Sequence, residues 1–231
     1  KYQVNKGENV CVVGHPLADY LIWPKQPLND AVWKIQDDSL KRVIWAPHHS
    51  ILKSDALDYS NFLLIAEDML KLAKEYSDKI QFAFKPHPVL KRKLYVLNEW
   101  GQEKTDAYYK KWEEMPNTTL VNGDYTDLFL TSSAMIHDCG TFTVEYLYLK
   151  KPVMFVGSEK HADRLTKFGR MCFNQHYVGD SIEQIRSFLD NVVLNGQDPK
   201  QHERENFFTK YLLPPKNRTV AENIYEELRN I

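Results

Sequence analysis

The stretch that most constrains the fold is residues 132–157, which predict a complete strand–helix–strand unit. Two short apolar runs, Ala134 to Ile136 and Val153 to Val156, are typical of buried strands. The residues between them follow the helical period up to Pro152, which ends the helix, and the lysines at 150–151 suit the negative end of its dipole. Parallel sheets are built from such units, so we expect an α/β fold.

The turn between the first of these strands and the helix is the first candidate binding site. It contains Asp138, Gly140 and Thr141. Ligands of open parallel sheets bind outside the carboxyl ends of the strands, and a helix N-terminus presents free N–H groups to an anion. Thr141 is also a suitable helix cap. The sequence therefore predicts anion binding at this turn.

Further runs extend this unit into a larger sheet. Additional strands are predicted at Val10 to Val13, Val43 to Ala46, Ile80 to Phe84 and Thr119 to Val121. Helices are predicted near Trp33, at 59–76, at 89–114 with a break at Gly101, at 127–130, from the capping box Ser181 to Gln184 onward to 195, at 205–211 and at 219–228; residues 51–58 and 158–172 are expected to be loops. The alternation predicts a Rossmann-like fold of three layers, a parallel sheet with helices on both faces.

Composition excludes several classes of protein. The chain of 231 residues has 30 basic and 31 acidic side chains, a balance that argues against nucleic acid as a partner. No apolar run approaches the roughly 20 residues that span a bilayer. Cys11 and Cys139 fall on or beside predicted buried elements and Cys172 makes the number odd, so we expect a reducing, cytoplasmic setting without disulfides.

Histidine is enriched where predicted strands end. His15, the pair His48–His49, His87 and His137 each follow a different predicted strand. These turns should gather at one edge of a parallel sheet, where histidines can donate to phosphate or act as acids and bases.

Structural roles compete with this interpretation. A single histidine in a strand-end turn is more often structural, and we expect His137 to point into the sheet. Asp138 is equally suited to cap the next helix, and Gly140 to form a tight turn. His161, His176 and His202 lack such context and are expected at the surface. No dinucleotide, phosphate-loop or metal-ligand spacing is present, so neither a metal nor another cofactor is expected.

Four short blocks together resemble the CDP-glycerol glycerophosphotransferases, the teichoic-acid polymerase-like and capsule-synthesis transferases. They cover roughly residues 10–157 in the family's order: Gly14-His15-Pro16-Leu17-Ala18-Asp19, Ile44-Trp45-Ala46-Pro47, Lys85-Pro86-His87-Pro88, and Ile136-His137-Asp138-Cys139-Gly140-Thr141 with Glu145-Tyr146 and Lys151-Pro152-Val153. The chain departs from the family pattern at three points. Leu17 replaces an arginine, His48-His49-Ser50 replaces a Thr-x-Arg-Asp-like turn, and Gly140-Thr141 replaces a serine pair.

The resemblance implies a GT-B architecture, in which two Rossmann-like domains enclose the active site. Residues 1–231 would form a single donor-binding domain that lacks the N-terminal domain, and helices at about 200–231 would pack back across that missing domain. The partners implied are a CDP-alcohol donor, a glycan or lipid-linked acceptor and the missing domain, which would also supply any peripheral association with the inner face of the membrane.

The resemblance also implies roles for individual residues. An acceptor hydroxyl would attack the β-phosphate of the CDP-alcohol and release CMP, with His87 neutralising charge and Asp138 orienting its turn. Gly140 and Thr141, with Lys85, His48 and His49, would bind donor phosphates. Glu145 would reach a ribose hydroxyl or form a surface ion pair. The alternatives are a GT-B enzyme that uses a UDP- or GDP-sugar and a non-catalytic nucleotide-binding domain.

Overall fold

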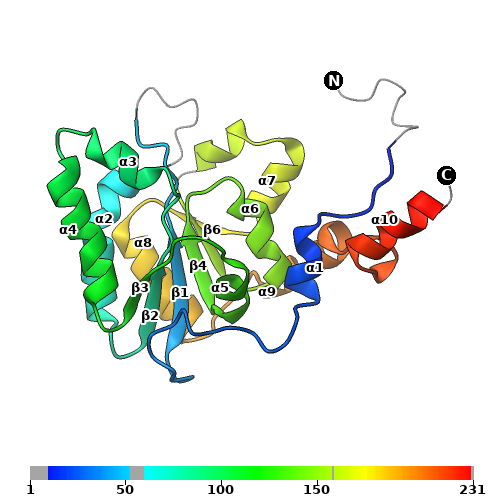
Figure 1. Cartoon of the computed structure of the whole chain (residues 1–231), viewed down its shortest axis with the longest axis horizontal. Coiled ribbons are helices and arrows are strands. Elements are labelled where there is room, and N and C mark those ends of the chain that lie inside the picture. Colours follow the sequence, from blue (N-terminus) through cyan, green and yellow to red (C-terminus); the bar gives the residue numbers. More distant parts are fainter. Residues whose placement is uncertain (1–9, 53–59, 158, 230–231) are drawn as a thin grey trace.

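The computed structural model describes residues 10–52, 60–157 and 159–229, and its centre is one parallel sheet (Figure 1). The strands are β1 (Lys41–Ala46), β2 (Ile80–Phe84), β3 (Thr118–Leu120), β4 (Ala134–His137), β5 (Val153–Val156) and β6 (Tyr177–Gly179). Their order is β3-β2-β1-β4-β5-β6, and every neighbouring pair is parallel. The chain thus winds outward from β1 and then from β4 in opposite directions, so the strand order reverses between these two strands.

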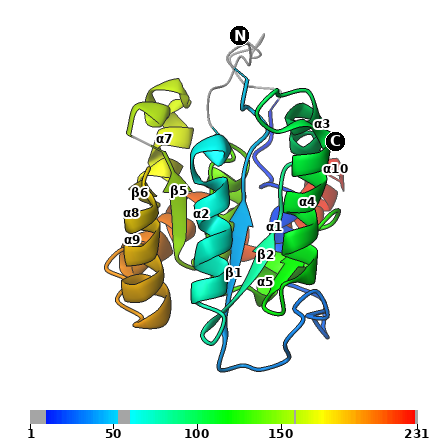
Figure 2. The same cartoon turned by 90° about the vertical axis from the view of Figure 1, so that its left-hand side faces the viewer.

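Helices cover both faces of this sheet (Figure 2). The α-helices are α1 (Leu17–Ile22), α2 (Phe62–Glu75), α3 (Leu90–Tyr95), α4 (Gly101–Glu114), α5 (Thr126–Thr131), α6 (Phe142–Glu145), α7 (Lys167–Phe173), α8 (Ile182–Ser187), α9 (Gln201–Phe207) and α10 (Val220–Arg229). Several continue as 3-10 or π turns: η1 (Tyr146–Leu149) follows α6, η3 (Phe188–Leu194) follows α8 and η4 (Phe208–Leu212) follows α9, while η2 (Glu159–Arg164) and η5 (Pro215–Asn217) stand apart. The predicted three-layer, Rossmann-like α/β architecture is confirmed.

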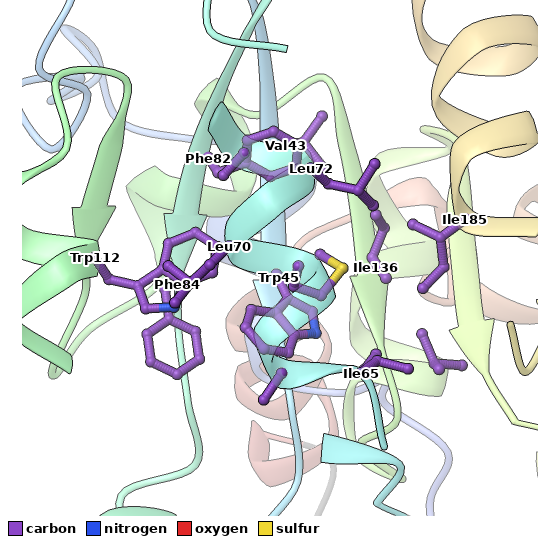
Figure 3. Packing of buried hydrophobic residues seen from close by; sticks show 14 of the residues in the cluster. Val43, Trp45, Ile65, Leu70, Leu72, Phe82, Phe84, Trp112, Ile136 and Ile185 are labelled. Atoms are coloured by element: carbon purple, nitrogen blue, oxygen red, sulfur yellow. The ribbon is translucent and has the colours of Figure 1, made fainter. Parts of the chain in front are cut away.

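Two hydrophobic cores explain the layers, because alternate residues of a strand face opposite sides of the sheet. Val43 and Trp45 of β1 pack in one core with α2, α4 and α8 (Figure 3), and Ile44 and Ala46 pack in the other with α1, α5 and η1. In the first core, the Trp45 ring stacks on Phe84 with 4.9 Å between ring centroids. Burial on both sides accounts for the nearly continuous apolar runs of these strands.

The predicted first strand is wrong. Residues 10–15 form no strand; they run beside α10, where the Asn223 amide donates to the Val13 carbonyl at 3.3 Å. Val12 is 79% exposed, and Cys11, expected near a buried element, is also exposed. The described sheet instead ends at β6, a three-residue strand that was not predicted from the sequence. An apolar run alone does not specify which partner covers it.

Other local predictions also fail for physical reasons. No helix forms near Trp33, which is held by burial and by donation of its indole N–H to Thr131. The supposed loop at 158–172 contains η2 and most of α7, a helix capped by Thr166 and buried mainly in its last turn. Only part of the predicted loop 51–58 belongs to the described residues, since positions 53–59 lie outside them.

Lys151 does not lie in a helical turn as predicted. Lys150 ends η1 with a positive φ of 59°, and the partly buried Lys151 ammonium donates to the carbonyls of Phe129, Leu130 and Ser132. The two nearer contacts are 2.6 Å. Lys151 therefore satisfies carbonyls at the end of α5 rather than those of its own helix.

The helix α10 lies outside the sheet, against α1 and residues 13–14 (Figure 1). The Asp19 carboxylate of α1 accepts from the Val220 N–H at 2.6 Å and from the Ala221 N–H at 3.0 Å. These contacts cap α10 and fix it to the segment that leads into the domain. Within the described residues, no helix is long and apolar enough to cross a membrane.

Candidate donor-binding site

A pocket of about 240 Å³ opens where the strand order reverses, at the carboxyl ends of β1, β2, β3 and β4. Its walls come from the turns that follow these strands: Ala46, Pro47, Lys85, Pro86, His87, Pro88, Gly123, Tyr125, Cys139, Thr141 and Phe142. Open α/β sheets bind ligands at this position. Of the candidate residues, the structure brings Lys85, His87 and Thr141 into one pocket.

Backbone hydrogen bonds hold the Lys85–His87 turn against the end of β1. The Lys85 N–H donates to Trp45 at 2.8 Å and the His87 N–H donates to Pro47 at 3.0 Å. The Lys85 ammonium donates to the Gly123 carbonyl at 3.0 Å, and burial lowers its pKa. Burial also lowers the pKa of His87, with smaller contributions from His49, Lys85 and Lys93. The Lys85 ammonium, a cation in a partly desolvated pocket, suits an anionic ligand.

Asp138 ties three chain segments together beneath the pocket. Its buried carboxylate accepts from the backbone N–H of His48 and, at 2.9 Å, from that of Asn61. The Asn61 amide in turn donates to Val156 at the end of β5. Burial raises the pKa of Asp138 to about 7. Asp138 is absent from the pocket wall, so the geometry assigns it a positioning contact, and its predicted catalytic part stays a prediction.

The Cys139–Phe142 turn lines the pocket through Cys139, Thr141 and Phe142. Thr141 occupies the N-cap position of α6, but its side chain does not cap the helix. The N–H groups of Thr141 and Phe142 are directed at the Cys139 sulfur; burial nevertheless raises the pKa of that thiol. Donors that converge on one atom at a pocket wall can also bind a phosphate oxygen. Thr141 lines the pocket and Gly140 does not, and the anion binding predicted for these two residues stays a prediction.

Tyr125 is a pocket residue that the sequence did not reveal. Its hydroxyl donates to the Glu145 carboxylate at 2.9 Å, and the Lys85 ammonium lies 5.4 Å from its ring centroid. Glu145 is nearly buried behind Tyr125, which explains why its pKa is raised. It forms neither an exposed ion pair nor part of the pocket wall. The one sequence feature that could have pointed to Tyr125 is the nearby Gly123, because glycine favours sharp turns. In the structure, Gly123 has a φ of 110° and forms such a turn after β3.

His48 and His49 lie just beyond the pocket and contact His87. The His49 ring centroid is 4.2 Å from those of both His48 and His87, and the His48 and His87 centroids are 5.2 Å apart. One ligand atom from each of the three rings lies within 4.8 Å of the others. A cluster with metal-binding potential therefore forms although the sequence has no metal-ligand spacing.

The remaining histidines are placed differently. His137 is buried as predicted, with its ring against Phe155 and His176. His176 was expected at the surface but is 1% exposed, because its ring packs against His137 and against Phe173 of α7. His15 precedes α1 and does not follow a strand, so it does not join the cluster at the sheet edge. His202 is exposed, as predicted.

A larger pocket of about 510 Å³ lies on the exposed side of α10, far from the strand ends. It is lined by side chains of that helix and of Arg218, which pairs with Glu226 at 2.7 Å. A surface hollow between exposed ion-paired side chains lacks converging donors from several elements. The pocket at the strand ends is therefore the better candidate for a ligand-binding site.

Comparison with known proteins shows the family and the fold of the chain. A profile of the family described as CDP-Glycerol:Poly(glycerophosphate) glycerophosphotransferase matches residues 1–230. The minor teichoic acid biosynthesis protein GgaB of Bacillus subtilis (strain 168) is 27% identical over 238 residues. That alignment covers 97% of this chain but 24% of GgaB.

Solved structures share the fold. The wall teichoic acid polymerase TagF superposes with a TM-score of 0.60 at 18% identity, covering 96% of this chain and 51% of TagF. The UDP-GlcNAc 2-epimerase from Neisseria meningitidis bound to UDP-GlcNAc gives 0.51 at 17% identity, covering 86% of this chain and 46% of the epimerase. The chain thus spans about half of these structures. Because the family profile extends over nearly the whole sequence, the chain belongs to the CDP-glycerol:poly(glycerophosphate) glycerophosphotransferase family.

Proposed function

We propose that this chain is the donor-binding part of a transferase that moves a glycerophosphate-type, or polyol phosphate, group from a CDP-alcohol to a glycan or lipid-linked acceptor. The observation that carries the proposal is that residues of two separate family-like blocks, Lys85 to Pro88 in one and Cys139 with Thr141 in the other, line one pocket where the strand order reverses. The names of two relatives, which refer to teichoic acid biosynthesis and to a teichoic acid polymerase, support a role in cell-surface polymer synthesis.

In the proposed reaction an acceptor hydroxyl attacks the β-phosphate of the donor and CMP leaves. The charge that develops on the diphosphate must be stabilised by fixed donors. Lys85 and His87 would supply them from the β2 turn, and the N–H groups around Thr141 would supply them from the β4 turn. Asp138 would hold the β1 and β4 turns in register through its two backbone contacts.

Tyr125 and Glu145 are proposed to serve the nucleoside end of the donor. The Tyr125 ring belongs to the wall formed with Phe142, and aromatic faces stack on bases. Glu145 fixes the Tyr125 hydroxyl, and its predicted contact with a ribose hydroxyl would require that hydroxyl to approach beside the tyrosine.

We further propose that a preceding domain completes the active site in a GT-B arrangement. This chain spans 51% of TagF and 24% of GgaB, which leaves room for other domains in its relatives. The α10 helix would pack against that domain. A cytoplasmic position at the inner membrane face, through other parts of the protein, fits a lipid-linked acceptor.

The test is binding of CDP, UDP and GDP to the purified chain by titration calorimetry. CDP is expected to bind more tightly than UDP or GDP. In the whole protein, His87→Ala is expected to lower turnover at least about 100-fold, because it removes a charge-stabilising donor, while the unfolding temperature stays unchanged.

The matched control is His202→Ala on the exposed side of α9, which should leave binding and turnover unchanged. Preferential binding of UDP or GDP would support a sugar-nucleotide transferase. Nucleotide binding without any turnover in the whole protein would support a non-catalytic domain.

A further inference from the structure

Two buried histidines, His137 and His176, contact each other close to the turn that carries Cys139. His137 is the last residue of β4, and His176 directly precedes β6. Their ring centroids are 5.2 Å apart. Neither is among the described residues that line the pocket, and the proposed reaction uses neither of them. Buried polar atoms are nearly always hydrogen-bonded, so the partners of the four ring nitrogens indicate what this pair does.

The backbone determines the tautomer of His137. The Cys139 N–H donates to Nδ1 of His137 at 3.1 Å. A ring nitrogen that accepts a hydrogen bond carries no proton, so a neutral His137 carries its proton on Nε2. Burial and the neighbouring His176 lower the pKa of His137, which keeps the ring neutral near pH 7. His137 is therefore a buried hydrogen-bond donor at Nε2.

The backbone determines the opposite tautomer in His176. Nδ1 of His176 lies 3.0 Å from the carbonyl oxygen of Cys172, in the last turn of α7. A carbonyl oxygen can only accept a hydrogen bond, so the proton of a neutral His176 lies on Nδ1. Burial lowers the pKa of His176 to about 3, and the charges of Arg204 and Lys200 contribute in the same direction. His176 is therefore a buried hydrogen-bond acceptor at Nε2.

The two Nε2 atoms are complementary. One is a donor and the other an acceptor, and neither has another hydrogen-bond partner among the residues that the structure describes. Leaving a buried donor or acceptor unpaired is destabilising. A hydrogen bond can join the two atoms directly, after a small rotation of one ring, or through one water. The donor and the acceptor are the same in both cases.

We propose that His176 is a positioning residue for the pocket at the strand ends, because it orients His137 by accepting the hydrogen bond from its Nε2–H. Nδ1 of His137 is then held toward the N–H of Cys139, which lines the pocket. His176 is itself held by the last turn of α7. The two rings thus join the turn after β4 to α7. The inference rests on the proposed function only for the identity of the pocket's ligand, a nucleoside diphosphate.

Nitrogen NMR of the whole chain with isotope-labelled histidine tests the two tautomers without any ligand. Near pH 7, His137 should be neutral with its proton on Nε2, and His176 should be neutral with its proton on Nδ1. Spectra of His137→Asn and His176→Asn would assign the signals. The same tautomer in both rings, or a charged ring, would overturn the inference, because the donor and the acceptor would no longer match.

Two substitutions of His176 separate its pairing with His137 from its contact with α7. In His176→Gln the amide oxygen can take the place of Nε2 and accept from His137, whereas in His176→Asn the shorter amide can keep only the contact with Cys172. Hydrogen exchange of the Cys139 amide should stay within about threefold of wild type in His176→Gln and become at least about tenfold faster in His176→Asn. The reverse order would show that His176 acts only by capping α7 and would overturn the inference.

Calorimetric titration with CDP extends the test to the pocket. CDP should bind His176→Gln within about threefold of wild type and His176→Asn at least about fivefold more weakly, because the turn with Cys139 is less well preorganised. The matched controls are His202→Gln and His202→Asn on the exposed side of α9, which should leave both exchange and binding unchanged. Thermal unfolding would verify that each variant folds, and the tautomers of the wild-type chain decide the question if one does not.

The outcomes separate this inference from the proposed function. Unchanged Cys139 exchange and unchanged CDP binding in both His176 variants would overturn the inference and leave the proposed function standing. The expected tautomers and exchange rates, together with a wild-type chain that does not bind CDP, would support the positioning role of His176 and contradict the proposed function.

Discussion

At the scale of single residues, the most unusual environment is that of two buried histidines behind the pocket. The ring centroids of His137 and His176 are 5.2 Å apart. His137 accepts the Cys139 N–H at Nδ1, whereas Nδ1 of His176 donates to the Cys172 carbonyl at 3.0 Å. The Nε2 atoms of both rings have no hydrogen-bond partner among the described residues. The turn that follows β4 is therefore stable only while these two buried rings stay neutral.

This pair predicts loss of stability in acid. Burial lowers the pKa of His176 from 6.5 to about 3 and that of His137 in the same direction. The unfolded chain therefore binds protons below about pH 6.5 that the folded chain does not, so stability falls as the pH drops through that window. His176 alone should account for about 3 kcal/mol between pH 6.5 and about 4.

Urea unfolding of wild type and His176→Asn at several pH values measures this effect. The asparagine amide can keep the hydrogen bond to Cys172, but it does not titrate, so the variant should lose less stability in acid. The raised pKa of Asp138, about 7, acts in the opposite direction, and the difference between the two proteins removes it. Identical pH slopes would show that His176 is not buried as a neutral ring.

At the scale of elements, the attachment of α10 depends on a close backbone approach. Gly14 has φ of 106°, and a Cβ atom added there would lie 2.8 Å from the Val220 side chain and 3.1 Å from Pro214. Both the backbone conformation and the space require glycine. The segment before α1 and the helix α10 consequently form one packed unit at the side of the domain.

Gly14→Ala is expected to loosen this unit. The residue would have to adopt a strained φ and displace Val220, at a cost of about 2–4 kcal/mol. Gly123→Ala is a matched control, since its φ is 110° but no atom lies within 4 Å of an added Cβ. Hydrogen exchange should show faster exchange of α10 amides in Gly14→Ala and unchanged exchange in Gly123→Ala. Equal effects of both substitutions would contradict a packing role for Gly14.

The elements also show what the sequence could and could not predict. Strands β1, β2, β4 and β5 are buried on both faces, so their apolar runs identify them within one to two residues. Residues 10–13 have the same apolar character but lie beside α10, with Val10 and Val12 largely exposed, and the sequence around β6 did not indicate a strand. Local composition shows that a segment is apolar, whereas the element that packs against the segment depends on long-range contacts.

The candidate site, like the strands, could be predicted only where its residues directly follow apolar runs. The turns after β2 and β4 follow from strand ends, so Lys85, His87 and Thr141 could be placed together. The contribution of Tyr125 depends on the path of the chain after the edge strand β3, and the contact between Glu145 and Tyr125 joins residues 20 positions apart. The inward position of His176 depends on α7, which the sequence did not indicate.

At the scale of the whole molecule, apolar side chains remain exposed on the unit formed by α1 and α10. Tyr20 is 58% exposed, and Tyr225 and Leu228 are each 64% exposed. Exposed apolar residues gathered on neighbouring helices are typical of surfaces that bind a partner. This observation supports the proposed preceding domain, because α10 projects to one side of the sheet rather than covering it (Figure 1).

The isolated chain should therefore bind CDP weakly and transfer nothing. Transfer in a two-domain cleft needs both walls, since only their closure aligns the acceptor hydroxyl with the β-phosphate and excludes water. The measurement is turnover of CDP-glycerol with a lipid-linked or glycan acceptor, with this chain alone and with a longer protein that adds the preceding domain.

In the longer protein, Tyr225→Ser combined with Leu228→Ser should lower turnover about tenfold or more by weakening the domain contact. The same double substitution in the isolated chain should leave its CDP affinity unchanged, because α10 is remote from the pocket. Turnover by the isolated chain at the rate of the longer protein would refute the two-domain proposal and still be compatible with the donor site at the strand ends.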